Sequence, residues 1–307
     1  MAISVIVCTH DRPHYLEACL AGIARQRDAP AFETIVVDSA SPPAGAGAIA
    51  ALAARHAARL LRTDRPGLSR ARNLGAAEAR GRWLAYIDDD AVPDTDWLAA
   101  IARAGAATPQ PAALGGKILP AFESPLPAWW PPQLVGALTV LTHDAPGVVG
   151  ESLPRDVELY GANFIVRAEA LATVGGFPEG LGRIGTRLLS NEESLVLRRF
   201  AAGGLRIAYD PAIRVTHSIQ AARLTPAWLL SRQYWQGVSA SRLAALTGER
   251  RKIWAAAPRL LTIGLVFGPL LLLARSSPAL LRQRCKAAYA WGVLRGLLAG
   301  KTVSSAG

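Results

Sequence analysis

Trp83-Leu-Ala-Tyr-Ile-Asp-Asp-Asp90 joins a short apolar run directly to three consecutive carboxylates. An apolar run of this length is typical of a buried strand. Two similar runs precede it, Ile3-Ser-Val-Ile-Val-Cys8 and Thr34-Ile-Val-Val-Asp38. Apolar residues at helical spacing predict helices between these strands, over residues 16–23, 48–61 and 69–79. Strands that alternate with helices predict an α/β fold with a parallel sheet covered by helices.

Polar side chains follow the three predicted strands at their carboxyl ends. Thr9, Asp38 and Asp88 each stand at such an end, and open α/β sheets bind ligands at this edge. The three successive carboxylates repel one another unless a cation lies among them. Mg²⁺ and Mn²⁺ prefer oxygen ligands and combine one or two carboxylates with phosphate oxygens. The alternative is an acidic turn in which Asp94 or Asp96 caps the next helix.

The net charge of +11 is carried by the last part of the chain. Residues 1–219 hold 21 Lys and Arg against 22 Asp and Glu, whereas residues 220–307 hold 13 Lys and Arg against one acid, Glu249. The last part therefore suits an anionic surface, and the first does not. No nucleic-acid recognition module is apparent, so we expect no nucleic acid partner. Three scattered cysteines indicate a reducing compartment, and the N-terminus lacks the pattern of a secretory signal.

The tail carries an uncharged apolar run, residues 260–274, between Arg259 and Arg275. The run is shorter than the roughly 20 residues that cross a bilayer as a helix, and Gly268-Pro269 would bend or break it. It therefore predicts a re-entrant or interfacial segment. We expect further helices over residues 226–246 and 279–299. The latter mixes apolar and basic residues like a helix on an anionic cytoplasmic leaflet, the alternative being a core helix with a solvated basic face.

Six segments resemble glycosyltransferase family 2 and occur in that family's order, over about residues 3–219. They are Val5-Ile-Val-Cys-Thr-His-Asp-Arg-Pro13, Val36-Val-Asp38, Gly67-Leu-Ser-Arg-Ala-Arg-Asn73 with the stretch from Ala79 to Asp90, Gly161-Ala-Asn-Phe-Ile-Val-Arg167, Val174-Gly-Gly-Phe-Pro-Glu179, and residues 190–199. The resemblance implies the GT-A fold, a Rossmann-like, mostly parallel sheet flanked by helices. The tail would add a C-terminal helical, membrane-associating extension.

The resemblance also implies how a nucleotide-sugar donor is bound. Thr9 and Asp11 match a loop that lines the nucleotide, Asp38 matches an acid that reads the base, and Arg72 matches a basic residue near the nucleotide. From the residues alone, Asp11 could form a polar turn before the next helix, and Arg72 could be a solvated helix residue.

The resemblance further implies a metal centre. Asp88, Asp89 and Asp90 match the DXD-type element, in which Asp88 and Asp89 contact the nucleotide sugar and Asp88 and Asp90 hold Mn²⁺ or Mg²⁺. His217 matches a histidine that some members add to that metal, although a lone histidine is more often packed or on the surface. A fixed cation offsets the charge that develops on a departing nucleoside diphosphate.

The attacking hydroxyl group of the acceptor needs a general base, usually a carboxylate within hydrogen-bonding reach. The resemblance points to Glu193 as that base and to Glu192 as a residue that orients the acceptor or tunes the base. The alternative is that both are first-turn acids favoured by the helix dipole.

Together these features predict a metal-dependent, inverting glycosyltransferase at the cytoplasmic face of a membrane. Residues 1–110 would bind the donor, residues 111–219 the acceptor, and residues 220–307 an anionic membrane surface. The acceptor would be a glycan or a lipid-linked group. One alternative is a membrane-associated scaffold of the same fold that lacks activity. Another is a nucleotidyltransferase, although the first strand lacks a glycine-rich, basic phosphate loop.

Overall fold

The computed structural model describes residues 2–107, 109–154, 157–272 and 277–299. The chain divides into two compact units. The sheet unit comprises residues 1–121, 139–179 and 196–218, and the helical unit comprises residues 122–138, 180–195 and 219–307, as far as these are described. Each unit therefore combines segments that are far apart in the sequence. The division into residues 1–110, 111–219 and 220–307 assigns binding roles to the chain rather than compact units, and it stays a prediction.

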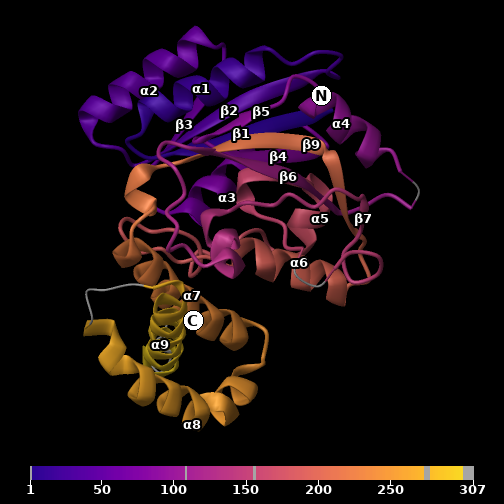
Figure 1. The fold of residues 1–307 in the computed structure, drawn as a ribbon. Coiled ribbons are helices and arrows are strands. Elements are labelled where there is room, and N and C mark those ends of the chain that lie inside the picture. Colours follow the sequence, from indigo (N-terminus) through magenta and orange to yellow (C-terminus); the bar gives the residue numbers. More distant parts are fainter. Residues whose placement is uncertain (1, 108, 155–156, 273–276, 300–307) are drawn as a thin grey trace. The chain divides into compact units, whose positions relative to one another are not determined.

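In the part of the chain that the structure describes, nine strands form one sheet in the order β3-β2-β1-β4-β8-β6-β9-β5, with β7 beside β9 (Figure 1). Their bounds are β1 Ile3–Thr9, β2 Phe32–Ser39, β3 Arg59–Thr63, β4 Trp83–Asp88, β5 Ala91–Pro93, β6 Ala113–Phe122, β7 Gly147–Val148, β8 Phe164–Arg167 and β9 Ile207–Ile219. The first four run parallel. Beyond β4, β8 pairs antiparallel with β4 and β6, and β9 pairs antiparallel with β5 and β7.

Helices cover both faces of this sheet. Figure 1 shows α1 and α2 on one face and α3 and α5 on the other. The described helices that precede residue 226 in the sequence are α1 Pro13–Ala24, α2 Pro43–Arg55, α3 Leu68–Glu78, α4 Trp97–Gly105, α5 Ala168–Thr173 and α6 Glu192–Ala202. Short 3₁₀ turns are η1 Pro132–Leu138, η2 Gly161–Asn163 and η3 Ala221–Arg223, of which η1 and η3 belong to the helical unit. Proline begins α1 and α2, where its missing N–H costs no hydrogen bond. The predicted α/β architecture is confirmed.

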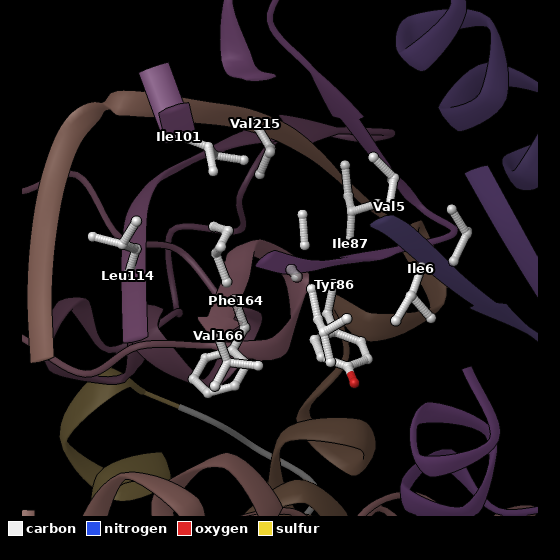
Figure 2. Packing of buried hydrophobic residues seen from close by; sticks show 14 of the residues in the cluster. Val5, Ile6, Tyr86, Ile87, Ile101, Leu114, Phe164, Val166 and Val215 are labelled. Carbon is white, nitrogen blue, oxygen red and sulfur yellow. The ribbon is translucent and has the colours of Figure 1, made fainter. Parts of the chain in front are cut away.

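The core of the sheet unit lies on both sides of the parallel strands. Successive side chains of a strand point to opposite faces, and Figure 2 shows Val5 and Ile87 on one side and Ile6 and Tyr86 on the other. All four are at most 2% exposed. Burial on both faces is why these strands read as continuous apolar runs rather than as alternating ones.

A buried amide joins the antiparallel strands to α4. The Asn163 side chain accepts a hydrogen bond from Trp97 Nε1 (3.0 Å) and donates to the carbonyl oxygens of Lys117 (3.1 Å) and Ile213 (2.8 Å). Asn163 is 1% exposed, and a buried amide without these partners would destabilise the fold. The polar residue in this apolar segment therefore has a structural role.

Two sequence predictions are corrected. The helix predicted over residues 48–61 ends at Arg55, and Arg59–Thr63 forms β3, which pairs in parallel with β2. Ala57 has φ = 50°, a left-handed conformation that stops the helix. The strands predicted over 207–211 and 213–217 are one strand, β9, because pairing with β5 and β7 continues on both sides of Pro211.

The helical unit is built around two closely packed helices. They are α7 Pro226–Leu246 and α9 Pro278–Ala299, so the predicted helices over 226–246 and 279–299 are confirmed. A Cβ atom at Gly237 of α7 would lie 2.2 Å from the Tyr289 carbonyl oxygen, and one at Gly292 of α9 would lie 2.0 Å from that of Tyr234. Glycine at both positions therefore lets the two backbones touch.

The third long helix, α8 Arg250–Phe267, is exposed. Of the described helices, it alone, taken as Arg250–Leu270, is long and apolar enough to cross a membrane, and 6% of its apolar window is buried. It ends at Phe267 and continues as a 3₁₀ turn, η4 Gly268–Leu272, as predicted for Gly268-Pro269. The last two residues of the predicted apolar run, 273 and 274, and residues 300–307 lie outside the described residues.

Helix α9 has a different environment from α8. Leu281, Cys285 and Ala288, which belong to its predicted apolar stripe, are buried, whereas Arg282 and Lys286 are exposed. This pattern favours the alternative of a core helix with a solvated basic face. Most of the large exposed apolar side chains in the described part of the tail lie on α8, although Trp291 and Leu298 of α9 are exposed as well.

Candidate active site

The carboxyl ends of β1, β2 and β4 bring the predicted donor-binding residues together. In the register of the parallel strands, Thr9 lies opposite Asp38, and Cys8 lies opposite Asp88. Thr9 Oγ1 donates a hydrogen bond to Asp89 Oδ2 (2.7 Å), and both residues are buried. The convergence expected from the strand pattern is therefore present in the sheet unit.

Asp89 and Asp90 share one cationic partner. Arg12, in the turn after β1, forms an ion pair with Asp89 and donates from Nη1 to Asp90 Oδ2 (2.9 Å). The side chain of Arg12 is one third exposed, whereas those of Asp89 and Asp90 are 0% and 2% exposed. Arg12 therefore supplies positive charge at the solvent side of two buried carboxylates.

Burial also acts on the protonation of this cluster. It raises the pKa of Asp89 to about 7, and the neighbouring carboxylates of Asp90 and Asp88 raise it too, against the opposing effects of Arg12 and of the Thr9 hydroxyl group. Burial destabilises the ionised form of a carboxylate relative to its neutral form, so a further cation nearby would stabilise the ionised site.

His217 reaches the cluster from a distant part of the sequence. Strand β9 pairs with β5 so that His217 lies opposite Ala91, and the N–H of Ser218 donates to the carbonyl oxygen of Asp90 (2.7 Å). This pairing places His217 Nε2 3.3 Å from Asp90 Oδ1, with both side chains 2% exposed. The structure therefore brings together two of the three predicted metal ligands.

Asp88 is more open than its neighbours, with its side chain 32% exposed. Arg72 Nη2 of α3 lies 3.4 Å from Asp88 Oδ1. The Arg72 guanidinium carbon also lies 5.4 Å from the ring centre of Phe177 and 6.0 Å from that of Tyr86, within cation–π range. Arg72 is buried and is not the solvated helix residue that the sequence alone allows.

Asp38 and Asp11 lie at the end of β2 and in the turn after β1. Asp38 is buried, accepts from the Ser41 N–H (2.9 Å), and forms an ion pair with Arg62 of β3, whose Nη1 lies 2.6 Å from Asp38 Oδ2. Asp11 has φ = 53°, and its N–H donates to Ser41 Oγ (2.8 Å). Glycine at position 45 leaves room for the Asp11 carboxylate, because a Cβ atom there would lie 2.1 Å from Asp11 Oδ1.

Sequence reasoning missed two arginines of this site. Arg12 lies in the first of the six matching segments but was given no role there, and Arg62 directly follows the helix predicted over residues 48–61. The partner of Arg62 follows from register, because Asp38 and Arg62 are directly opposite each other on β2 and β3. No pattern within residues 59–63 alone reveals that pairing.

The donor atoms of this cluster suit a hard divalent cation. Among the described residues, no group of three or more His, Cys, Asp or Glu side chains is arranged to hold a metal. The adjacent carboxylate of Asp90 and imidazole of His217 are oxygen and nitrogen donors that Mn²⁺ accepts. A cation with few protein ligands completes its coordination with water and phosphate oxygens, so these residues fit a metal that binds together with a diphosphate.

Glu192 and Glu193 belong to the helical unit, in the first turn of α6. Glu192 is buried and Glu193 is partly exposed. A polar network on α7 holds the residues just before them. Gln236 Oε1 accepts from Ser190 Oγ (2.7 Å) and from Arg232 Nη1 (2.9 Å).

Two further hydrogen bonds connect Ser190 and Asn191 to α7. Gln236 Nε2 donates to Asn191 Oδ1 (3.0 Å), and the N–H of Ser190 donates to Ser239 Oγ (3.0 Å). Asn191 has φ = 74°, so the chain enters α6 through a left-handed residue that α7 fixes. The tail helix α7 therefore supports the acidic turn.

Comparison with known proteins relates the first half of the chain to a family. The sequence model of Glycosyl transferase family 2 matches residues 4–145, which contain every donor-site residue described above except His217. Residues 4–145 of this chain are therefore similar to glycosyltransferase family 2. The prediction made from the six segments is confirmed.

Two curated relatives are similar to this chain in sequence. A glucosyl-dolichyl phosphate glucuronosyltransferase of Haloferax volcanii is 30% identical over 177 residues, which is 56% of this chain and 54% of the relative. The match thus spans about half of that relative's length. The succinoglycan biosynthesis protein ExoM of Rhizobium meliloti is 26% identical over 260 residues, 79% of this chain and 75% of the relative.

Solved structures identify the fold as GT-A. The mannosyltransferase PcManGT from Pyrobaculum calidifontis, in complex with GDP-Man and Mn²⁺, matches 99% of this chain and 75% of its own, with a TM-score of 0.57 and 21% identity. TarS residues 1–349 from S. aureus, in complex with UDP, match 98% of this chain and 92% of their own, with a TM-score of 0.55 and 17% identity. The predicted fold is therefore confirmed.

Proposed function

We propose that this chain is a metal-dependent, inverting glycosyltransferase that moves a sugar from a nucleoside-diphosphate donor to a hydroxyl acceptor. The observation that carries the proposal is the buried polar cluster at the carboxyl edge of β1, β2 and β4. The solved structures of similar fold support it, since they contain GDP-Man with Mn²⁺ in one case and UDP in the other.

The donor would bind at this edge of the sheet unit. Thr9 and Asp11 would line the nucleotide, Asp38 would bind the base, and Arg72 would contribute positive charge near the phosphates. Asp38 is fixed by Arg62 and Ser41, which supports a role that needs an ordered carboxylate. Asp89, held by the Thr9 hydroxyl group, would contact the sugar with Asp88.

Asp88, Asp90 and His217 would hold Mn²⁺ or Mg²⁺. When bound, the ion would supply fixed positive charge to the departing diphosphate. Arg12 keeps a second positive charge beside Asp89 and Asp90. The role of the chain's own residues is to hold these charges in place before the reaction, so that no reorganisation is needed as the leaving group forms.

Glu193 would accept the proton of the attacking hydroxyl group, and Glu192 would orient the acceptor. The partial exposure of Glu193 supports this choice, because a general base must be reachable by the acceptor, whereas Glu192 is buried. The division into a donor half, 1–110, and an acceptor half, 111–219, rests on these roles.

The acceptor would be a lipid-linked group or a polysaccharide, handled at the cytoplasmic face of a membrane. The curated relative that is named for a dolichyl-phosphate-linked sugar supports a lipid-linked acceptor. The exposed apolar helix α8 supports membrane association, as does the surplus of basic residues beyond residue 219. No nucleic acid partner is expected.

The test is a donor screen with the full chain. UDP- and GDP-sugars are supplied with and without Mn²⁺, and release of the nucleoside diphosphate is measured by chromatography. Metal-dependent release with at least one donor is expected. If no donor is turned over but UDP or GDP still binds, the inactive scaffold is correct. Release of pyrophosphate from a nucleoside triphosphate would instead identify a nucleotidyltransferase.

A further inference from the structure

The helical unit contains a pocket that no role above uses. It has a volume of about 490 Å³ and lies between α8 and α9, with single residues from α7 and η1 completing its wall. Its apolar wall includes Leu260 and Ile263 of α8 and Tyr289 of α9. A pocket of this size accommodates the polar group and part of the chain of an amphiphile.

Three cations line the same pocket, Arg259 from α8 and Arg282 and Lys286 from α9. No acidic residue lines it. Within the described part of the chain, none of these three side chains forms an ion pair or a hydrogen bond, and all three are exposed. Like charges gathered in one pocket repel one another, so an anion bound among them would stabilise the arrangement.

The rest of the tail does not provide that anion. Glu249 is the one acid in residues 220–307, and it is engaged with Lys252, whose Nζ lies 2.8 Å from Glu249 Oε1, and with Thr247. The anion that complements the pocket must therefore come from outside this segment.

The surface beside the pocket indicates what carries the anion. Apart from Arg259, the residues of α8 from Ile253 to Phe267 are uncharged. Large apolar side chains of this helix are exposed, with Leu265 at 61% and Val266 at 59%. A helix with this surface lies among lipid chains, where an Arg is costly unless an anionic group pairs with it.

We propose that this pocket binds the phosphate group of an acidic membrane phospholipid, with Arg259, Arg282 and Lys286 around the phosphate and the acyl chain along Leu260 and Ile263. Inorganic phosphate would contact only the cations and not the apolar wall. A zwitterionic lipid would add its own positive charge to a pocket that is already basic. The proposal rests on the membrane association proposed above and is independent of the transfer reaction.

The experiment counts lipids bound to the full chain in neutral detergent by native mass spectrometry. Short-chain phosphatidylglycerol, phosphatidylcholine, an isoprenyl phosphate and inorganic phosphate are titrated separately. One phosphatidylglycerol should bind saturably, about tenfold or more tighter than phosphatidylcholine, as expected for two or three added ionic contacts. Equal binding of the two lipids would overturn the proposal. So would tighter binding of the isoprenyl phosphate, or full competition by inorganic phosphate.

A pair of charge-matched variants locates the site. The pocket variant combines Arg259→Gln, Arg282→Gln and Lys286→Gln, and the control combines Arg251→Gln, Lys252→Gln and Arg295→Gln, exposed residues of α8 and α9 that do not line the pocket.

The pocket variant should lose the preference for phosphatidylglycerol, about tenfold in affinity, and the control should keep it. An equal loss in both variants would refute a discrete site. Thermal melting checks folding, and Arg259→Gln alone serves if the triple variant is unstable. Flotation with phosphatidylcholine vesicles tests membrane association separately, so a chain that floats but shows no lipid preference refutes only the pocket.

Discussion

Replacement of Gln236 by alanine should weaken both the helical unit and the reaction. The Gln236 side chain takes part in three hydrogen bonds, accepting from Ser190 and Arg232 and donating to Asn191. Each such bond contributes about 1 kcal/mol net, and the one from the charged Arg232 contributes more. Because Gln236 is only partly buried, water can replace some of these contacts. We expect Gln236→Ala to lower the free energy of unfolding by roughly 2–3 kcal/mol.

The same change should displace the turn that leads into Glu192 and Glu193. A misplacement of about 1 Å can lower a rate by roughly 10²-fold, so kcat should fall about 10- to 100-fold. KM for the donor should change little, because the donor residues belong to the sheet unit. Urea denaturation and initial-rate kinetics measure the two effects.

The control for this prediction is Gln233→Ala. Gln233 lies three residues earlier on α7, and among the described residues its side chain has no hydrogen-bond partner. If Gln236→Ala and Gln233→Ala lose the same stability and the same kcat, then α7 does not position the acidic turn, and the reasoning fails.

Three further outcomes are expected. Arg12→Ala leaves two buried carboxylates without their shared cation and should lower the free energy of unfolding in urea by roughly 3 kcal/mol. The control, Arg55→Ala, removes an exposed ion pair with Glu17 and should lower it by under about 1 kcal/mol. Equal losses of stability would contradict the role of Arg12 in the cluster. Glu193→Gln should lower kcat about 10²- to 10⁴-fold in single-turnover assays, and a larger loss in Glu192→Gln would show that the wrong carboxylate was chosen. Burial raises the pKa of Glu33, but hydrogen bonds from Ser4 and the Arg80 N–H and the charge of Arg59 lower it more, so the pKa lies below that of a free glutamate. The stabilisation that Glu33 provides is therefore present above the pKa of the unfolded chain and lost as pH falls. Glu33→Gln should destabilise the chain at pH 7 and have the stability of the wild type in acid, and a constant difference in stability across pH would refute this.

The α/β part of the fold could be predicted because its signals are local. The strands β1, β2 and β4 are buried on both faces, so their apolar runs are visible in the sequence, and polar residues at their ends mark one edge of the sheet. Helix α9 could be predicted from the spacing of its apolar residues, and α7 from the change of composition after residue 219. Strand β3 could not be predicted, because its short Arg-Leu-Leu-Arg-Thr segment becomes a strand only by pairing with β2.

Residues of the candidate site that belong to a motif were predicted from the sequence, whereas residues that join the site only through a contact were missed. Asp88, Asp90 and His217 were named from the resemblance, and the pairing of β9 with β5 explains how His217 reaches Asp90. The ion pairs of Arg12 and Arg62 depend on register and on the path of the chain after β1. The helical unit combines residues 122–138, 180–195 and 219–307, a partition that no local pattern indicates.

The packing of α9 against α7 limits the variants that can test membrane association of the tail. Deletion of residues 253–307 would uncover buried residues of α7 that lie against α9, such as Val238 and Ser241, and would destabilise the helical unit rather than release it from a membrane. Substitutions of exposed α8 residues avoid this problem, because Leu265 and Val266 contribute little to the core.

The central claim, a cation-assisted diphosphate site at the end of β4, is tested most directly by calorimetric titration of UDP and GDP with and without Mn²⁺. In the wild type, Mn²⁺ should tighten binding of at least one of the two nucleotides. Asp90→Asn preserves the size of the side chain but removes its charge, and it should reduce that Mn²⁺-dependent gain about tenfold or more. Thermal melting should show that the variant remains folded. An undiminished Mn²⁺-dependent gain in Asp90→Asn would contradict the account.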